Sequence, residues 1–343
     1  MQQVSVGLCL HRPEMIPLIS EAMRRPEAIF LEEPPTPGFD QMVQGELSVD
    51  DYMLPIDVEY PAFSRDMCCL LRELHAGGKK IYQVEPFIES LLSIHEFFAE
   101  GHKPDDLAKN SIHFYVYRAE RAATGALLSY YQTVGTGTFE EALEAIIRFA
   151  RADAARFRLR DSLRAQALVS LVEEYPSSYI ESGLIHYQLW RLLRDRLPSH
   201  VRVQPLFLAD AALRSMGEKG HLYGPGDQLT LLYIFHPTIS QPGREKLLAA
   251  RSMIYSKILE KQESNGDGET FPHLRDELAC IQAARRLSLD DCRHLFPLIR
   301  RTGTLVARQI LTSFLAASKP AGYLEPQALL SPHGPQALSS MAI

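Results

Sequence analysis

Short, continuous apolar runs alternate with amphipathic stretches along much of the chain. Runs of this length, rich in valine, isoleucine, tyrosine and phenylalanine, are typical of strands buried on both faces. Six of them predict strands, at residues 4–10, 28–31, 54–58, 80–84, 178–181 and 201–208. Apolar residues at three- and four-residue spacing predict helices between strands, at 14–25, 64–76 and 184–197. This order indicates βαβ units, and hence an α/β fold with a mainly parallel sheet flanked by helices.

The middle and the end of the chain carry helical patterns. Helices are predicted in the middle at 87–100, 112–132, 139–155 and 159–174. After residue 210 the predicted helices are 211–217, 228–235, 244–263, 274–286 and 290–318. We therefore expect an α/β domain at 1–210 with a helical insertion at about 100–175, then a helical C-terminal region at 211–318. The run at 264–269 is predicted to be a flexible link, and 319–343 a loose tail.

Composition narrows the class of protein. The chain has 343 residues, of which 46% are hydrophobic, and a formal net charge of −6, which is typical of a soluble globular protein and unfavourable for nonspecific nucleic-acid binding. Its five cysteines form no CxxC pair, so neither a disulfide framework nor a zinc ribbon is expected. The N-terminus lacks a basic segment before its apolar run, and no run reaches the roughly 18 apolar residues of a membrane span. A cytoplasmic protein without membrane contact is the expectation.

Titratable residues lie at or just after the ends of the first five predicted strands. They are His11 and Glu14, Glu32 and Glu33, Asp57 and Glu59, Glu85, and finally Glu181 and His186. In an open parallel sheet, ligands bind outside the carboxyl ends of the strands, so these residues are candidates for a site. Strands also end in water, and solvated loop charge is the alternative interpretation for any one of them.

Two histidines stand out among these residues, because imidazole titrates near neutral pH. With a carboxylate, His11 and His186 could ligate a divalent metal that keeps an open position, or act as general acid and base without a metal. They are too far apart in sequence for a local metal motif, so the site depends on the fold. Hydrogen-bonded structural histidines are the alternative.

Two segments resemble motifs of the TraB/Tiki-like superfamily, whose branches include erythromycin-esterase-like and ChaN-like haem-binding proteins. The run RDSLRA, which starts at Arg160, resembles its arginine-bearing helix, and GLIH, which ends at His186, resembles its GxxH turn. The first such turn would be LCLH, which ends at His11 and has Leu8 in place of glycine. The acidic strand end would be FLEE, at 30–33. The resemblance covers about the first 200 residues and leaves out the helical C-terminal region.

This resemblance implies a hydrolase of an ester or amide in a small molecule or peptide, either metal-dependent and peptidase-like or metal-independent and esterase-like. The catalytic residues it implies are His11, Glu32, His186 and Arg160, and the metal ligands His11, Glu32 and His186. Further candidates for binding substrate are Glu14, Glu85, Glu181 and Arg118. The competing hypothesis is a non-enzymatic protein that uses the same cleft for haem or a peptide, or that regulates a partner. Leu8, which stands in place of the glycine of the superfamily motif, favours this hypothesis. The long helix at 244–263 would allow homo-oligomer contacts.

Neighbouring residues separate some of these roles. Glu32 and Glu33 would point to opposite faces of an extended chain, so only one could enter the cleft, and the resemblance selects Glu32. Arg160 and Arg164 share a helix face. We expect Arg160 to orient a carboxylate or an oxyanion, and Arg164, at a position usually apolar in the superfamily, to belong to a solvated charge cluster.

Overall fold

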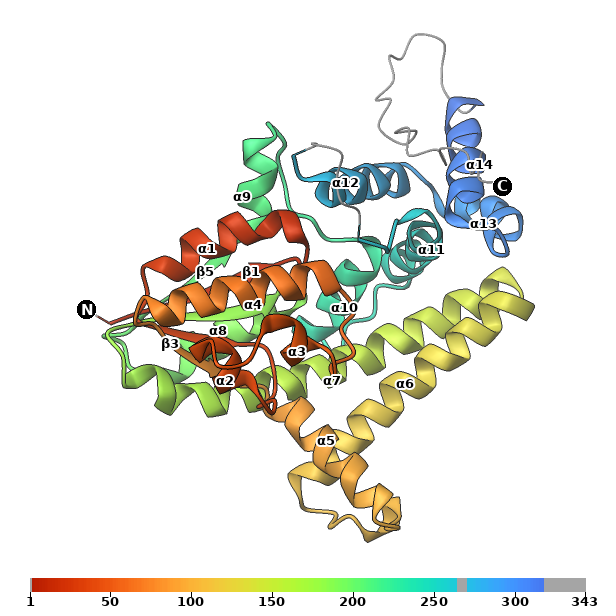
Figure 1. The fold of residues 1–343 in the computed structure, drawn as a ribbon. Helices are drawn as coiled ribbons and strands as arrows, with labels where there is room; N and C mark the ends of the chain where they lie inside the picture. The colour runs from red at the N-terminus through yellow and green to blue at the C-terminus, as the bar shows by residue number, and fades with distance from the viewer. Residues whose placement is uncertain (1, 264–269, 318–343) are drawn as a thin grey trace, which may run out of the picture.

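The computed structural model describes residues 2–263 and 270–317, so the predicted link at 264–269 and tail at 319–343 lie outside the described residues. Its centre is one sheet of five parallel strands in the order β3-β2-β4-β1-β5 (Figure 1). The strands are β1 (Gln3–Cys9), β2 (Ala28–Leu31), β3 (Lys80–Gln83), β4 (Ser177–Gly183) and β5 (Arg202–Phe207). A parallel sheet flanked by helices confirms the predicted α/β class.

One predicted strand is wrong. Residues 54–58 form a turn and an irregular segment after the short helix α3 (Val49–Met53). Pro55 has no backbone N–H to donate to a neighbouring strand, and Leu54 is 85% exposed, so the run cannot serve as an interior strand. The segment lies instead at the wall of the pocket described below.

Two layers of helices cover the sheet. Helices α1 (Ile16–Arg24), α4 (Pro61–Ala76) and α9 (Leu208–Ser215) pack their apolar faces on one side. The last turns of α7 (Phe139–Glu173) and helix α8 (Tyr187–Arg196) cover the other. Strand β1 contacts both helix layers, because successive side chains point to opposite faces of the sheet. Val4, Val6 and Leu8 lie on the α7 side. Short elements complete this half: α2 (Phe39–Gln44) and the 3₁₀ turns Pro13–Met15 and Leu184–His186.

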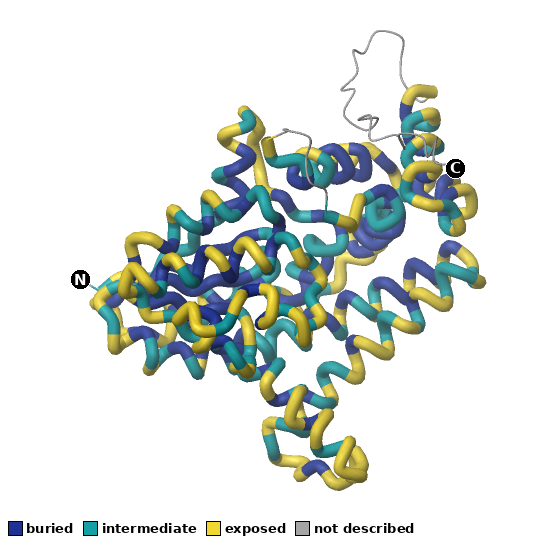
Figure 2. Tube along the Cα trace, in the orientation of Figure 1, coloured by how far each residue is buried: buried dark blue, intermediate teal, exposed yellow. Residues whose placement is uncertain are grey.

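The segment between β3 and β4 is helical. It contains α5 (Pro86–Ala99), a 3₁₀ turn (Pro104–Asp106), α6 (Ile112–Thr136) and α7. The two helices predicted at 139–155 and 159–174 are one helix of 35 residues, because residues 156–158 contain neither glycine nor proline to interrupt it. Figure 2 shows the segment 100–106 after α5 exposed, whereas the first half of α7 is buried along one side.

The C-terminal helices form one bundle with that first half of α7, which α10, α11 and α13 contact directly. They are α10 (Pro225–Phe235), α11 (Pro242–Ile258), α12 (Pro272–Arg285), α13 (Leu289–Ile299) and α14 (Thr304–Ala317). The helix predicted at 290–318 is therefore two helices, with a break at 300–303 that includes Gly303. One continuous apolar core joins these helices to α6 and α7. Within the described ranges, no helix combines the length and the apolar character that crossing a bilayer requires.

Gly7, in the middle of β1, gives a first testable result. A Cβ at this position would lie 1.9 Å from the hydroxyl oxygen of Tyr179, which is fully buried beside it in β4. Gly7→Ala is therefore expected to lower the free energy of unfolding by about 1–3 kcal/mol, the usual effect of overpacking a core. Urea denaturation followed by circular dichroism measures the change.

Gly125→Ala is the matched control, because no heavy atom lies within 4 Å of a Cβ built at that position in α6. Alanine in an exposed helix interior should raise the free energy of unfolding, by up to about 1 kcal/mol. Equal effects of the two substitutions would contradict the close approach of Tyr179.

A carboxyl pair in the C-terminal half predicts a pH dependence. Burial raises the pKa of Glu277 to about 7, and the charge of Asp227, whose own pKa burial raises to about 6, adds to the effect. The folded chain therefore keeps the proton of Glu277 at a pH where the unfolded chain, with a pKa near 4.5, has released it. The free energy of unfolding should fall as pH rises from about 4.5 to 7, by about 1–3 kcal/mol from Glu277 alone.

Glu277→Gln should remove this pH dependence, because an amide does not titrate. The amide oxygen can still accept the hydrogen bond that the Tyr255 hydroxyl donates to Glu277 at 2.9 Å. We expect the variant to be more stable than the native chain at pH 8 and about equal to it at pH 5. Thermal unfolding at both pH values tests this, and a native chain that gains stability between pH 5 and pH 7 relative to the variant would contradict it.

Candidate functional site

The carboxyl ends of three neighbouring strands bring the candidate residues together. Parallel pairing aligns Cys9 of β1 with Gly183 of β4, and Phe30 of β2 with Ile180 of β4. The residues that follow these strands therefore meet at one edge of the sheet, as expected for an α/β fold. His11 comes just after β1 and Glu32 directly after β2.

His11 and two carboxylates form the centre of this edge. His11 Nε2 lies 2.8 Å from Glu181 Oε1, and the backbone N–H of Glu32 donates to Glu181 Oε2 at 2.9 Å. One ligand atom from each of His11, Glu32 and Glu181 lies within 4.8 Å of the other two. Burial disfavours the charged imidazole, but the hydrogen bond and charge of Glu181 outweigh it and raise the pKa of His11.

Glu32 is held rigidly by groups behind it. The backbone N–H of Gly183 donates to Glu32 Oε2 at 2.6 Å, while Arg160 Nη2 lies 2.8 Å and His186 Nε2 lies 2.7 Å from Oε1. Burial alone would raise the pKa of Glu32, but the charges of His186 and Arg160 hold it well below its usual range. Glu32 is therefore an anion at neutral pH, fixed at the edge of the sheet.

His186 contacts Glu32, as the predicted convergence requires, but it does not line the pocket beside His11. It is 2% exposed, and its two ring nitrogens contact carboxylates, Nε2 with Glu32 and Nδ1 with Asp161 at 2.5 Å. Burial lowers its affinity for a proton, but the two carboxylates raise the pKa of His186 to about 9. The ring is a buried cation that holds Glu32, with neither nitrogen free for a metal. The structure thus brings together His11, Glu32 and Glu181 as candidate metal ligands, whereas the sequence predicted His11, Glu32 and His186.

Arg160 and Arg164, both on α7, lie close to the carboxylates of Glu32 and Glu85. Arg160 Nε lies 3.1 Å from Glu85 Oε2, and Glu85 is fully buried, so burial raises the pKa of this carboxyl despite both arginines. Arg164 is not the solvated residue that was expected. It is fully buried and donates to the carbonyl oxygens of Val84 at 2.9 Å and Glu181 at 2.8 Å.

Three residues predicted to bind substrate face elsewhere. Glu85 is fully buried and contacts Arg160. Glu14 accepts hydrogen bonds from the backbone N–H and the ring Nδ1 of His273, at 3.0 and 2.7 Å, and so anchors the start of α12. Arg118 is exposed on α6, with its guanidinium over the Phe114 ring. None of the three lines the pocket beside His11, so a substrate-binding role does not follow from these positions.

A pocket of about 330 Å³ opens above His11, Glu32 and Glu181. Residues of α2, α3, α4 and the irregular segment 54–60 form its walls. Glu33 also lines it, contrary to the expectation that only Glu32 would, because both residues lie beyond the end of β2, where strand alternation no longer applies. The Phe63 ring stacks on the His11 imidazole with 5.0 Å between centroids.

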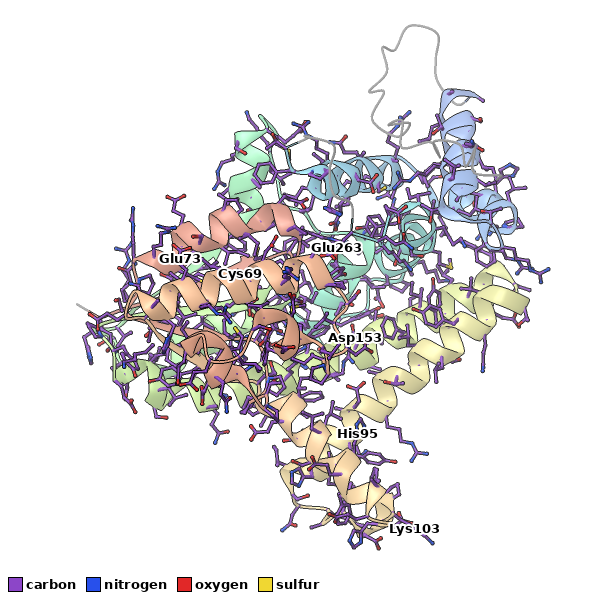
Figure 3. All side chains as sticks on the ribbon, in the orientation of Figure 1. Cys69, Glu73, His95, Lys103, Asp153 and Glu263 are labelled. Carbon is purple, nitrogen blue, oxygen red and sulfur yellow. The ribbon has the colours of Figure 1, made fainter. Side chains whose placement is uncertain are left out.

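The C-terminal half holds this wall in place. Glu263 lies at the N-terminal end of α4 (Figure 3), where its carboxylate accepts hydrogen bonds from the backbone N–H groups of Ala62 and Phe63 at 2.8 and 3.0 Å. Arg12 lies over the Tyr60 ring and donates to the carbonyl oxygen of Lys261. These contacts fix the aromatic side of the pocket next to His11.

Comparisons with known proteins give one relative. The chain is 28% identical over 286 residues to a protein of Archaeoglobus fulgidus described as an uncharacterized protein, and the match covers 83% of this chain and 94% of the relative. No protein-family model matches the chain. No solved structure matches it either. The function must therefore be argued from the site.

Proposed function

We propose that this chain is a metal-dependent hydrolase that cleaves an ester or amide bond in the pocket above His11. The observation that carries the proposal is the cluster of His11, Glu32 and Glu181, whose ligand atoms lie within 4.8 Å of one another at the floor of that pocket. The resemblance to the TraB/Tiki-like superfamily, noted at His11, Glu32, Arg160 and His186, implies the same class of reaction.

The donor set fits a divalent ion. One imidazole nitrogen and two carboxylate groups suit borderline and hard cations, and three protein ligands leave an open position for substrate. An ion held there would supply Lewis acidity, which polarises a carbonyl oxygen and makes water a stronger acid. Its binding requires the neutral imidazole, so His11 must release its proton, and affinity should increase with pH.

The surrounding residues orient the ligands. Glu32 is held by Arg160, His186 and the Gly183 N–H, and Glu181 by the Glu32 N–H. Asp161 in turn holds His186. Groups behind the ligands commonly fix ligand orientation in metal sites, and their loss weakens metal binding by about 10- to 100-fold. This arrangement favours chemistry at the pocket floor over a purely structural role.

Haem fits the pocket poorly. Its propionates are anionic, whereas Glu32, Glu33, Glu59 and Glu181 line the pocket and no lysine or arginine among the described residues does. We therefore favour the hydrolase over haem binding.

Metal analysis and substrate screening test the proposal. We expect stripped protein to bind one Zn²⁺, Mn²⁺ or Co²⁺ per chain by calorimetry, and the loaded protein to hydrolyse a member of an ester and peptide panel. A chelator should stop hydrolysis, and added metal should restore it. Glu181→Gln should weaken binding, whereas the exposed Glu46→Gln should not. Stoichiometric metal binding without hydrolysis would contradict the proposed enzyme activity. Hydrolysis that continues in the presence of the chelator would contradict the proposed metal dependence.

A further inference from the structure

The pocket walls above the candidate metal ligands are aromatic. Phe39, Tyr52, Tyr60 and Phe63 line it, with the Phe39 and Tyr52 rings edge-to-face at 6.2 Å between centroids. Aromatic faces attract cations through the ring quadrupole, most strongly where water is excluded. The chain itself uses this attraction at the wall, because the buried Arg12 guanidinium lies 4.5 Å from the centroid of the Tyr60 ring.

The described lining residues carry more negative than positive charge. Four glutamates line the pocket, while His11 is its one lining residue of a cationic type, and it already contacts Glu181. Glu32 and Glu181 are engaged by groups on the sheet side. Glu33 and Glu59 are exposed and accept hydrogen bonds only from neutral donors, the Gln83 amide and the Tyr60 hydroxyl. Neither forms an ion pair with any residue that the structure describes.

An anionic ligand would bind unfavourably in this pocket, because it would lie beside four carboxylates, and the described residues that line the pocket include no arginine or lysine. A cationic group gains from both features, the unpaired carboxylates and the aromatic rings. The volume of about 330 Å³ limits the occupant to a small molecule or one side chain of a larger one.

We propose that the pocket takes a substrate with a small apolar body and a cationic amine, with the amine between Glu33, Glu59 and the aromatic wall. The placement of the ester or amide bond over His11 rests on the proposed function, whereas the preference for an amine does not. The amine lies toward the mouth of the pocket, and the scissile bond at the floor.

Three isosteric probes test the charge preference without any reaction. They are 3-methylbutylamine, 3-methylbutanol and 4-methylpentanoate, which share the 3-methylbutyl group and differ in charge. With metal-free protein, we expect the amine to bind about tenfold more tightly than the alcohol, the combined effect of an exposed ion pair and a cation–π contact. The carboxylate should bind more weakly than the alcohol.

The methionine methyl groups report where a probe binds. Met53 and Met67 line the pocket, whereas Met23 of α1 is fully buried and Met253 lies in the C-terminal core. In methyl-labelled protein, titration with the amine should shift the Met53 and Met67 signals and leave the other two unchanged. The double variant Glu33→Gln/Glu59→Gln should lose the preference, and Glu46→Gln, an exposed residue outside the pocket, should keep it.

The alternative results overturn the proposal. Equal binding of amine and alcohol, tighter binding of the carboxylate, shifts confined to methyl groups outside the pocket, or no binding up to the solubility of the amine would each do so. A preference that survives in Glu33→Gln/Glu59→Gln would also overturn it. Hydrolysis is not measured in this titration, so failure of the amine preference leaves the proposed hydrolase standing, and absence of hydrolysis leaves the amine preference standing.

Discussion

Replacing His11 with alanine is expected to lower kcat/KM for the proposed ester or amide hydrolysis by about a thousandfold or more, the size typical of losing a residue central to catalysis. His11 supplies the only nitrogen of the candidate ligand set, and its ring contacts Glu181 at 2.8 Å. The substitution also removes the ring on which Phe63 stacks, so the floor and the wall of the pocket lose their common contact.

The matched control is His95→Ala, because His95 is exposed on α5, away from the pocket (Figure 3). The control should keep native kcat/KM, and both variants should keep native circular dichroism. Metal titration gives a second readout: His11→Ala should bind the divalent ion far more weakly, whereas His95→Ala should bind it as the native chain does. If His11→Ala kept a tenth of native activity with native metal content, the imidazole would not be a ligand.

Strand positions could be predicted from sequence because burial on both faces leaves a continuous apolar run. The run at 54–58 shows where this signal fails, since it combines apolar residues with Pro55 and lies at a pocket wall instead of in a sheet. The two merged helices and the divided last one show a second limit: apolar spacing does not mark where a helix ends, whereas the lack of glycine and proline at 156–158 and the presence of Gly303 do.

The site could be predicted in part for a topological reason. His11, Glu32 and Glu181 follow or end parallel strands, and parallel strands bring their carboxyl ends together. The same rule selected Glu14 wrongly, because it does not say which way a loop turns after a strand. Arg118 lies on an exposed helix face far along the chain from any strand end.

Asp161 and Arg164 were harder to predict, because charged residues normally mark a solvated helix face. One signal was present. Asp161 shares a helical stripe with Ala165, Leu168 and Val172, all fully buried, and Arg164 is next to it. A charged residue on such an apolar stripe is expected to be buried with polar partners. Asp161 contacts His186, and Arg164 contacts Glu85 and Val84. These partners come from other segments of the chain, which the stripe does not reveal.

Arg164→Met is the second large prediction: it should lower the free energy of unfolding by about 3–5 kcal/mol, the usual cost of removing one partner of a buried charge network. Arg164 donates to two carbonyl oxygens and to Ser182 Oγ, and lies within 4 Å of Glu32 and Glu85. Methionine fills similar volume but leaves these acceptors unpaired in the protein interior. Urea denaturation at pH 7 measures the loss, with the exposed Arg148→Met on the same helix as a control of little effect.

A second substitution separates loss of charge pairing from loss of packing. Both Glu85 side-chain oxygens are buried without a hydrogen bond, so the two arginines are what stabilise its charge. If unpaired charge dominates, Glu85→Gln should recover a sizeable part of the stability lost in Arg164→Met, because a neutral amide needs no counter-ion. If packing dominates, the two substitutions should act additively. Arg164→Met within about 0.5 kcal/mol of the native chain would contradict the buried network itself, since that is the range of ordinary surface substitutions.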